Sequence, residues 1–178
     1  MFRWLIRVVL PVLILSGCTP VKPPPSRTEQ QHLAKLLKQL DRTIPAREAS
    51  ALASDIIRYA DELNRRFERT TDPRIHNFLV NIGLKERGLC YQYSDALYAY
   101  LIHRHYPHFA FHPVGTHIGE FWREHNALVV TARGERMEEG IVIDAWRESQ
   151  RLYFSPVKED RAYHWTERPE RAYAQNGR

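Results

Sequence analysis

Three side chains of the types that act together in covalent catalysis occur in this chain at Cys90, His125 and Asp144. A cysteine thiolate can attack a carbonyl carbon, an imidazole can move the proton, and a carboxylate can orient the imidazole. The chain has two cysteines, and the residues around Cys18 indicate that its thiol is modified. One thiol then remains, and an unpaired thiol in an oxidising compartment is expected to be buried or chemically useful.

The position of Cys90 suits a nucleophile. It is the second residue of a helix predicted from Leu89 to about Arg104, and it follows a loop that ends at Gly88. A helix N-terminus stabilises anions, which favours the thiolate, and its free N–H groups can bind a developing oxyanion. The alternative is a small buried apolar residue, which a cysteine without a disulfide often is.

Strand pairing can be predicted by arithmetic. The runs Asn126–Ala132 and Ile141–Trp146 are typical of two strands of a hairpin with its tip at residues 134–135, so paired residues have numbers that sum to 269. This pairing places His125 opposite Asp144 on the same face of the sheet, about 5 Å apart. A carboxylate in an apolar strand needs such a partner, but a one-residue bulge would separate the two side chains.

The order of elements predicts an α+β fold, because the helical patterns precede the strand patterns. The helices are expected at Thr28–Leu40, Ala46–Arg69, Asp72–Gly83 and Leu89–Arg104, and the strands at Phe109–Val114, Asn126–Ala132, Ile141–Trp146 and Arg151–Phe154. The polar segment from Thr166 onward is expected to fray.

The residues around the three side chains resemble a known family. Gly88-Leu89-Cys90 at a helix start, Glu124-His125-Asn126 at a strand start and Val142–Trp146 in the next strand are similar to the motifs of transglutaminase-like (papain-like) cysteine enzymes. The order Cys, His, Asp matches, as do the gaps of 35 and 19 residues. The resemblance covers Ile75–Phe154, and in outline the chain resembles bacterial transglutaminase-like cysteine proteinases and small envelope lipoproteins of proteobacteria.

The resemblance implies a papain/transglutaminase-like core, in which a helix that carries the cysteine packs on an antiparallel sheet that carries His and Asp, with added N-terminal helices. It implies that Cys90 is the nucleophile, His125 the base and acid, and Asp144 the residue that orients the imidazole. The backbone N–H of Cys90 would be the first oxyanion donor. The chain departs from the pattern at Ala127, where many members carry an aromatic residue, and at Leu84, where papain-like relatives carry a glutamine as second donor.

Three further groups of side chains carry weaker signals. Aromatic residues near the triad in sequence could form walls of a substrate groove, although such residues are more often part of a core: Tyr91, Trp122 and Trp146. Arginines after the triad are expected on a solvated face: Arg147, Arg151 and Arg161. A run of histidines could bind metal, but its spacing matches no zinc motif: His103, His105, His108, His112 and His117. We therefore expect no metal and, without a glycine-rich phosphate loop, no nucleotide cofactor.

The N-terminus is typical of an exported lipoprotein. A basic start with Arg3 and Arg7, an apolar stretch too short to span a bilayer, and Leu15-Ser16-Gly17-Cys18, which resembles a bacterial lipobox, predict a signal peptide at 1–17 and lipidation of Cys18. Acyl chains on Cys18 would anchor the protein to the outer membrane, facing the periplasm, because Thr19 replaces the aspartate that retains such proteins at the inner membrane. The alternative is an ordinary signal peptide.

Length and composition predict one domain. The chain has 178 residues, with 43% hydrophobic and 26% charged residues, which excludes a disordered chain and a multi-span membrane protein. Its formal charge is +5, of which Arg3 and Arg7 contribute two, and the remaining +3 is too weak to indicate nucleic-acid binding. We expect a proline-rich tether at 18–27, a domain at 28–165 with a helical addition at 28–70 and a core at 73–165, and a polar tail at 166–178.

Together these features predict an envelope-anchored cysteine hydrolase or acyltransferase. Its substrates would be amide bonds of periplasmic proteins or of peptidoglycan peptides. The alternative is a lipoprotein without catalytic activity that uses the same cleft to bind a peptide or a protein partner.

Overall fold

The structure is a computed structural model that describes residues 26–68, 72–120, 122–148 and 151–176. The predicted signal peptide, Cys18 and the tether up to residue 25 lie outside the described residues. None of the described helices is both long enough and apolar enough to cross a membrane.

Four helices lie close to the predicted ranges. They are α1 (Arg27–Gln39), α2 (Ala46–Arg66), α3 (Pro73–Asn81) and α4 (Cys90–Ile102). Local capping explains where two of them begin. The Ser26 side chain accepts the N–H of Glu29 while the Glu29 carboxylate accepts the N–H of Ser26, and Asp72 caps α3 in front of Pro73.

The strands form one antiparallel sheet of five in the order β4-β3-β2-β1-β5. Four of them match the prediction, and β5 adds a short strand at one edge: β1 (Phe109–Thr116), β2 (His125–Ala132), β3 (Ile141–Glu148), β4 (Arg151–Pro156) and β5 (Thr166–Glu167). The prediction of an α+β fold is confirmed for the residues that the structure describes.

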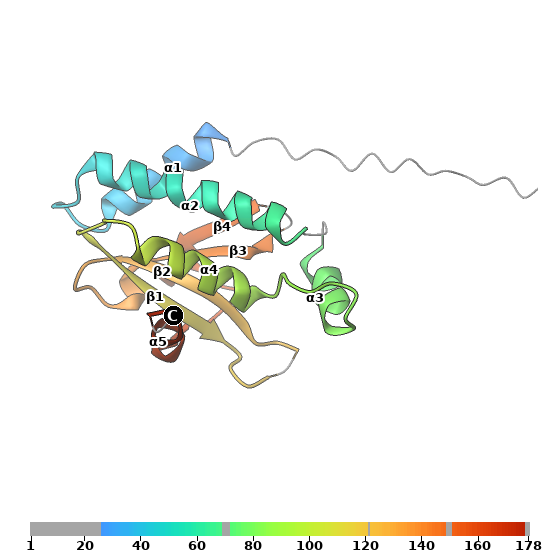
Figure 1. Ribbon diagram of the computed structural model, residues 1–178. Helices are drawn as coiled ribbons and strands as arrows, with labels where there is room; N and C mark the ends of the chain where they lie inside the picture. Colours follow the sequence, from blue (N-terminus) through green and yellow to red (C-terminus); the bar gives the residue numbers. More distant parts are fainter. Residues whose placement is uncertain (1–25, 69–71, 121, 149–150, 177–178) are drawn as a thin grey trace, which may run out of the picture.

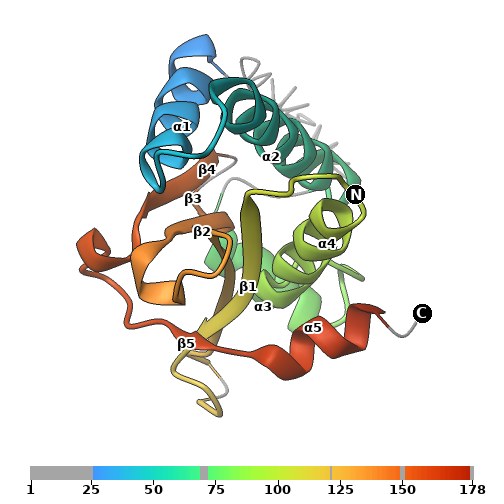
Figure 2. The same cartoon turned by 90° about the vertical axis from the view of Figure 1, so that its left-hand side faces the viewer.

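The sheet is covered on both faces. Helices α1, α2 and α4 lie on one face (Figures 1 and 2), where the core includes Leu37, Leu97 and Leu128. On the other face, Trp165 packs with side chains of β1, β2, β3 and the 3-10 helix η1 (Met137–Glu139), beside a second one, η2 (Val157–Glu159). All eight residues of β2 are therefore buried.

The predicted register between β2 and β3 is wrong by two residues. The structure pairs Leu128 with Ile143 and Val130 with Ile141, so paired numbers sum to 271. The connection between the strands is longer than a tight turn because it contains η1. A shift of two residues preserves the face on which each side chain lies, so His125 and Asp144 still share a face as diagonal neighbours.

The prediction that the chain frays from Thr166 is also wrong. Thr166 pairs with Gly115 in the sheet, and α5 (Pro169–Asn176) follows directly. The Arg171 guanidinium forms an ion pair with Asp95 of α4. Backbone pairing and ion pairs hold this segment, and neither leaves an apolar pattern in the sequence.

We predict that α1 and the sheet unfold together, because Leu33 and Leu37 are fully buried in the core that α4 and β2 also form. Leu37→Ala should lower the free energy of unfolding by about 2–5 kcal/mol, as expected for a truncated buried leucine. Urea unfolding followed by circular dichroism measures this and should show one transition. The exposed Leu84→Ala is the matched control; an equal loss in both variants would contradict the shared core.

Candidate active site

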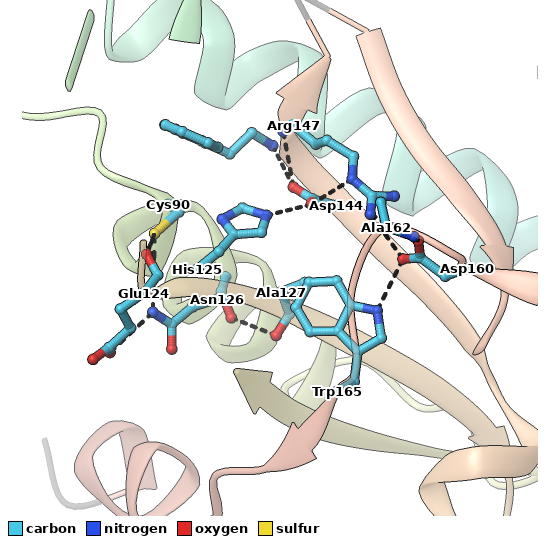
Figure 3. Close-up of polar contacts among 12 residues, drawn as sticks. Cys90, Glu124, His125, Asn126, Ala127, Asp144, Arg147, Asp160, Ala162 and Trp165 are labelled. Atoms are coloured by element: carbon cyan, nitrogen blue, oxygen red, sulfur yellow. Dashed lines mark hydrogen bonds and ion pairs between the residues drawn. The ribbon is translucent and has the colours of Figure 1, made fainter. Parts of the chain in front are cut away.

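Cys90 is the first residue of α4, where the helix meets the beginning of β2. The residue is 8% exposed, and its thiol forms no disulfide. Sγ lies 3.9 Å from the carbonyl oxygen of Glu124 and 3.9 Å from Nδ2 of Asn126 (Figure 3). The backbone N–H of a residue at this helical position has no partner within the helix. Cys90 thus combines a buried thiol with an amide that is available to a ligand.

The loop before Cys90 is held at Gly88 from three sides. Its N–H donates to Oε1 of Gln92 at 2.7 Å, and its carbonyl accepts from Nε1 of Trp146 at 3.1 Å. The His76 ring, whose Nε2 contacts the Arg87 carbonyl oxygen at 2.8 Å, occupies the space where a Cβ would be. With φ at +117°, only glycine adopts this conformation without strain.

His125 and Asp144 are hydrogen-bonded, as the sequence predicted from a slightly different register. Nε2 of His125 donates to Oδ2 of Asp144 at 2.5 Å, and both side chains are almost completely buried. The other ring nitrogen, Nδ1, is buried and has no hydrogen-bond partner among the described residues. Figure 3 shows the ring between Cys90 and Asp144. Asp144 thus fixes Nε2, and Nδ1 lies on the side of the Cys90 thiol (Figure 3).

Backbone amides hold the second oxygen of Asp144. Oδ1 accepts the N–H of Trp146 at 3.0 Å and that of Arg147 at 2.9 Å. The pairing of β3 with β4 is irregular between Asp144 and Glu148, and within this irregular stretch the carboxylate accepts both N–H groups. A buried carboxylate with three donors is satisfied in its ionised form.

Burial and charge act in opposite directions on this pair. Burial lowers the pKa of His125, but the Asp144 carboxylate, its hydrogen bond and the nearby Cys90 outweigh burial and raise this pKa from 6.5 to about 10. Burial raises the pKa of Asp144, but the imidazolium and the two backbone donors outweigh it, so the pKa lies below 3.8. An imidazolium at neutral pH would stabilise a thiolate at Cys90.

Aromatic rings enclose the imidazole of His125. The ring centroids of Trp146, Tyr163 and Trp165 lie 5.0, 5.1 and 5.7 Å from that of His125. Sequence reasoning proposed Trp146 as a groove wall and missed the other two. Tyr163 and Trp165 form an aromatic pair in an otherwise polar stretch, which is the one signal that could have revealed them.

The prediction that Arg147 lies on a solvated face is wrong. Its guanidinium is largely buried, lies over the rings of Tyr153 and Tyr163, and donates to both oxygens of the buried Asp160 at 2.8 and 2.9 Å. Asp160 also accepts Nε1 of Trp165. Arg147 therefore ties the aromatic enclosure to β3. The other two arginines of that group, Arg151 and Arg161, are exposed as predicted.

The three groove candidates have different environments. Trp122 is 69% exposed and Tyr91 is 38% exposed, so both are accessible to a ligand. Trp146 is half-buried between Gly88 and His125. It packs against both residues and does not form an open groove wall.

The histidine run does not gather at one point. His108 contacts Glu48, His112 contacts both Glu167 and Thr131, and His117 contacts Glu120. In the part of the chain that the structure describes, no cluster of three His, Cys, Asp or Glu side chains has the geometry to bind a metal ion.

Comparison of the chain with protein-family models, with curated proteins and with solved structures found no match. The chemistry of the site therefore follows from its geometry: a thiol at a helix N-terminus, an imidazole oriented by a carboxylate, and a buried, largely aromatic surrounding.

We predict that Gly88→Ala disrupts the thiol site, whereas Gly83→Ala does not. Both glycines have positive φ, at +117° and +77°, but a Cβ at Gly88 would lie 2.0 Å from Nε2 of His76, and one at Gly83 would meet no described atom within 4 Å. Gly83→Ala should cost about 1–2 kcal/mol of backbone strain. Gly88→Ala should cost more and change the rate at which a neutral alkylating reagent modifies Cys90. The prediction is wrong if Gly88→Ala and Gly83→Ala lower the stability equally and change the alkylation rate of Cys90 equally.

We predict that the contribution of the His125–Asp144 pair to stability depends on pH. Because the pKa of His125 is raised to about 10, the stabilisation that His125 contributes is complete below pH 6.5 and is lost as the pH rises through about 10. Because the pKa of Asp144 is lowered, the stabilisation that Asp144 contributes is present above pH 3.8 and is lost in acid. Asp144→Asn should therefore cost about 3–5 kcal/mol near pH 6, and clearly less near pH 10.

Urea unfolding at pH 6 and pH 10 measures this difference. Asp41→Asn is the control, because the Asp41 carboxylate, whose pKa is lowered by its hydrogen bonds to Thr43, is ionised at both pH values. Asp41→Asn should change the free energy of unfolding by the same amount at pH 6 and at pH 10. An Asp144→Asn cost that does not change with pH would show that His125 is not charged in the folded protein near pH 6.

Proposed function

We propose that this protein is a cysteine acyl-transfer enzyme, a hydrolase or acyltransferase that acts on amide bonds through Cys90, His125 and Asp144. The observation that carries the proposal is the buried His125–Asp144 hydrogen bond, beside which Cys90 lies on the side of the remaining ring nitrogen (Figure 3). A structural cysteine needs neither an imidazole nor a carboxylate that orients it.

The geometry supports a two-step reaction. The Cys90 thiolate forms a C–S bond to the amide carbon, and the π electron pair moves to oxygen. The tetrahedral adduct collapses, the C–N bond breaks, and His125 gives its proton to the leaving amine, which leaves a thioester. Water or an amine, deprotonated by His125, then attacks the thioester and releases Cys90 as thiolate. Asp144 stabilises the imidazolium throughout.

The arrangement of elements supports a papain/transglutaminase-like core for this reaction. Helix α4, which carries Cys90 at its first residue, packs on β1, β2 and β3 of the sheet that carries His125 and Asp144. Ala127, where the resemblance leads one to expect an aromatic residue, belongs to the same apolar cluster as Trp165. An aromatic ring from elsewhere in the chain thus lies beside His125.

The surface around Cys90 favours a polypeptide with apolar side chains as the substrate. The large apolar side chains that are exposed in the described residues fall into two groups, one from α3 to the start of α4 and one in the β1–β2 connection: Ile75, Phe78, Ile82, Leu84 and Tyr91, and Ile118 and Trp122. Figure 1 shows α3 and the β1–β2 connection at the end of the molecule where α4 begins. An extended chain over Cys90 would contact both groups.

The predicted lipid on Cys18 would place this site at the outer membrane facing the periplasm, where protein segments and peptidoglycan peptides provide amide bonds. A second candidate is a lipoprotein without turnover that binds a peptide. The same exposed apolar surface favours it, and the reactivity of Cys90 distinguishes the two.

We predict that iodoacetamide modifies Cys90 rapidly at pH 6, well below the ordinary thiol pKa of about 8.5. The reason is that an imidazolium beside the sulfur favours the thiolate. His125→Ala should lower the rate at pH 6 by at least about tenfold, since each 1.4 kcal/mol of lost thiolate stabilisation is a factor of ten. Mass spectrometry of the peptide that contains Cys90 measures the rate without interference from Cys18.

The control is His105→Ala, an exposed histidine outside the site. It should leave both the rate and its pH dependence unchanged. If Cys90 in the folded protein reacts only near pH 8.5 or above, or if His125→Ala has no effect, the enzyme is excluded and the binding protein remains.

A further inference from the structure

Asn126 is a buried polar side chain that points at the reacting sulfur. Its residue is 3% exposed, and Nδ2 lies 3.9 Å from Sγ of Cys90. His125 and Asn126 are consecutive in β2, so their side chains leave opposite faces of the strand. Cys90, at the end of this strand, therefore has the imidazole on one side and the amide on the other (Figure 3).

The neighbours of Asn126 fix which end of its amide faces Cys90. Nη1 of Arg168 donates to Oδ1 of Asn126 at 3.1 Å, and an arginine can only donate. On the other side, the Glu124 carboxylate accepts from Nδ2 at 3.4 Å. Arg168 and Glu124 also form an ion pair with each other. The oxygen of the amide is thus held by a cation, and its NH₂ group is directed at the thiol.

Gly115 makes this arrangement possible. It is paired with Asn126 in the β1–β2 ladder, and a Cβ at Gly115 would lie 2.7 Å from Cδ of Arg168. The Arg168 backbone is fixed to the same strand by the bond from its N–H to the Pro113 carbonyl oxygen at 2.8 Å. Its side chain crosses β1 where no side chain stands in the way, and it reaches Asn126 from the edge of the sheet.

We propose that Asn126 is the second oxyanion donor of this site, and that Arg168 is the positioning residue that holds its amide in the donating orientation. The proposal rests on the proposed function, because it assigns a role in the same reaction. When the thiolate adds to a carbonyl carbon, the new oxyanion is two bonds from sulfur. A donor 3.9 Å from the sulfur can approach that oxygen to roughly 3 Å.

The backbone N–H of Cys90 would be the first donor, so the oxyanion would lie between a main-chain and a side-chain amide. Leu84, at the position where papain-like relatives carry a glutamine, is 71% exposed, and its side chain has no hydrogen-bond donor. Asn126 supplies the missing amide from the strand instead of from the loop before the helix.

The test compares two reactions of Cys90 in the full chain. Acetylation by p-nitrophenyl acetate forms a C–S bond through a tetrahedral oxyanion and releases p-nitrophenolate. Alkylation by iodoacetamide displaces iodide without any oxyanion. Asn126→Ala should lower the acetylation rate by about 10²–10³-fold, as removal of an oxyanion donor does elsewhere, and should change the alkylation rate little. Mass spectrometry of Cys90 measures both rates.

Arg168→Met should show the same split between the two rates to a smaller extent, because Asn126 remains but its amide is free to rotate. Arg168→Lys, which keeps a cationic donor, should restore part of the acetylation rate. Arg151→Met removes an arginine that is ion-paired with Glu29 on α1, and it should change neither rate. Circular dichroism and thermal unfolding verify that each variant is folded.

Each other outcome has a definite meaning. If Asn126→Ala lowers both rates equally, the amide stabilises the thiolate and is not an oxyanion donor. If it lowers neither, or if Cys90 is alkylated rapidly but is never acetylated, the assignment of Asn126 falls while the nucleophile stands. If Cys90 reacts with neither reagent, the proposed function itself falls, and the role of Asn126 falls with it.

Discussion

The buried carboxylate of Asp144 is the constraint on which the site depends. A charge at this depth is costly unless both carboxylate oxygens accept hydrogen bonds. Asp144 meets this condition by accepting from His125 and from the backbone N–H groups of Trp146 and Arg147. The bonds to the backbone require the irregularity in β3, and the bond to His125 fixes the imidazole at the start of β2. One carboxylate therefore sets the local shape of two strands.

Trp146 links this carboxylate to the loop that carries Cys90. Its backbone N–H binds Asp144, its ring lies against His125, and its indole N–H donates to the Gly88 carbonyl oxygen. The loop that ends at Cys90 is thus attached to the strand that carries the carboxylate. Because each contact restrains the next, a substitution at Gly88 is expected to alter the position of the imidazole, and a substitution at Asp144 is expected to alter the position of the thiol.

The sequence predicted α1 to α4, β1 to β4 and the neighbourhood of Cys90, His125 and Asp144, but not the C-terminal segment that packs against them. Apolar patterns located α1, α2, α4 and β1 to β4, whereas the Asp72-Pro73 start located α3, whose only buried residue is His76. The partnership of His125 with Asp144 was predicted in spite of a register error, since a shift of two residues keeps the face. The residues 160–171 were not predicted, because Asp160, Arg168 and Arg171 hold them through polar contacts that no period reveals.

That C-terminal segment connects the two sides of the site. Tyr163 and Trp165 enclose the imidazole on one face of the sheet, and a few residues later Arg168 crosses β1 to reach Asn126 on the other. Asp160 anchors the beginning of the segment to Arg147, next to Asp144. The residues from Asp160 to Arg168 therefore contact both the imidazole of His125 and the amide that faces the thiol. In the proposed reaction, loosening this segment would impair both proton transfer by His125 and oxyanion binding by Asn126, whereas loss of the Asn126 side chain alone would impair only oxyanion binding.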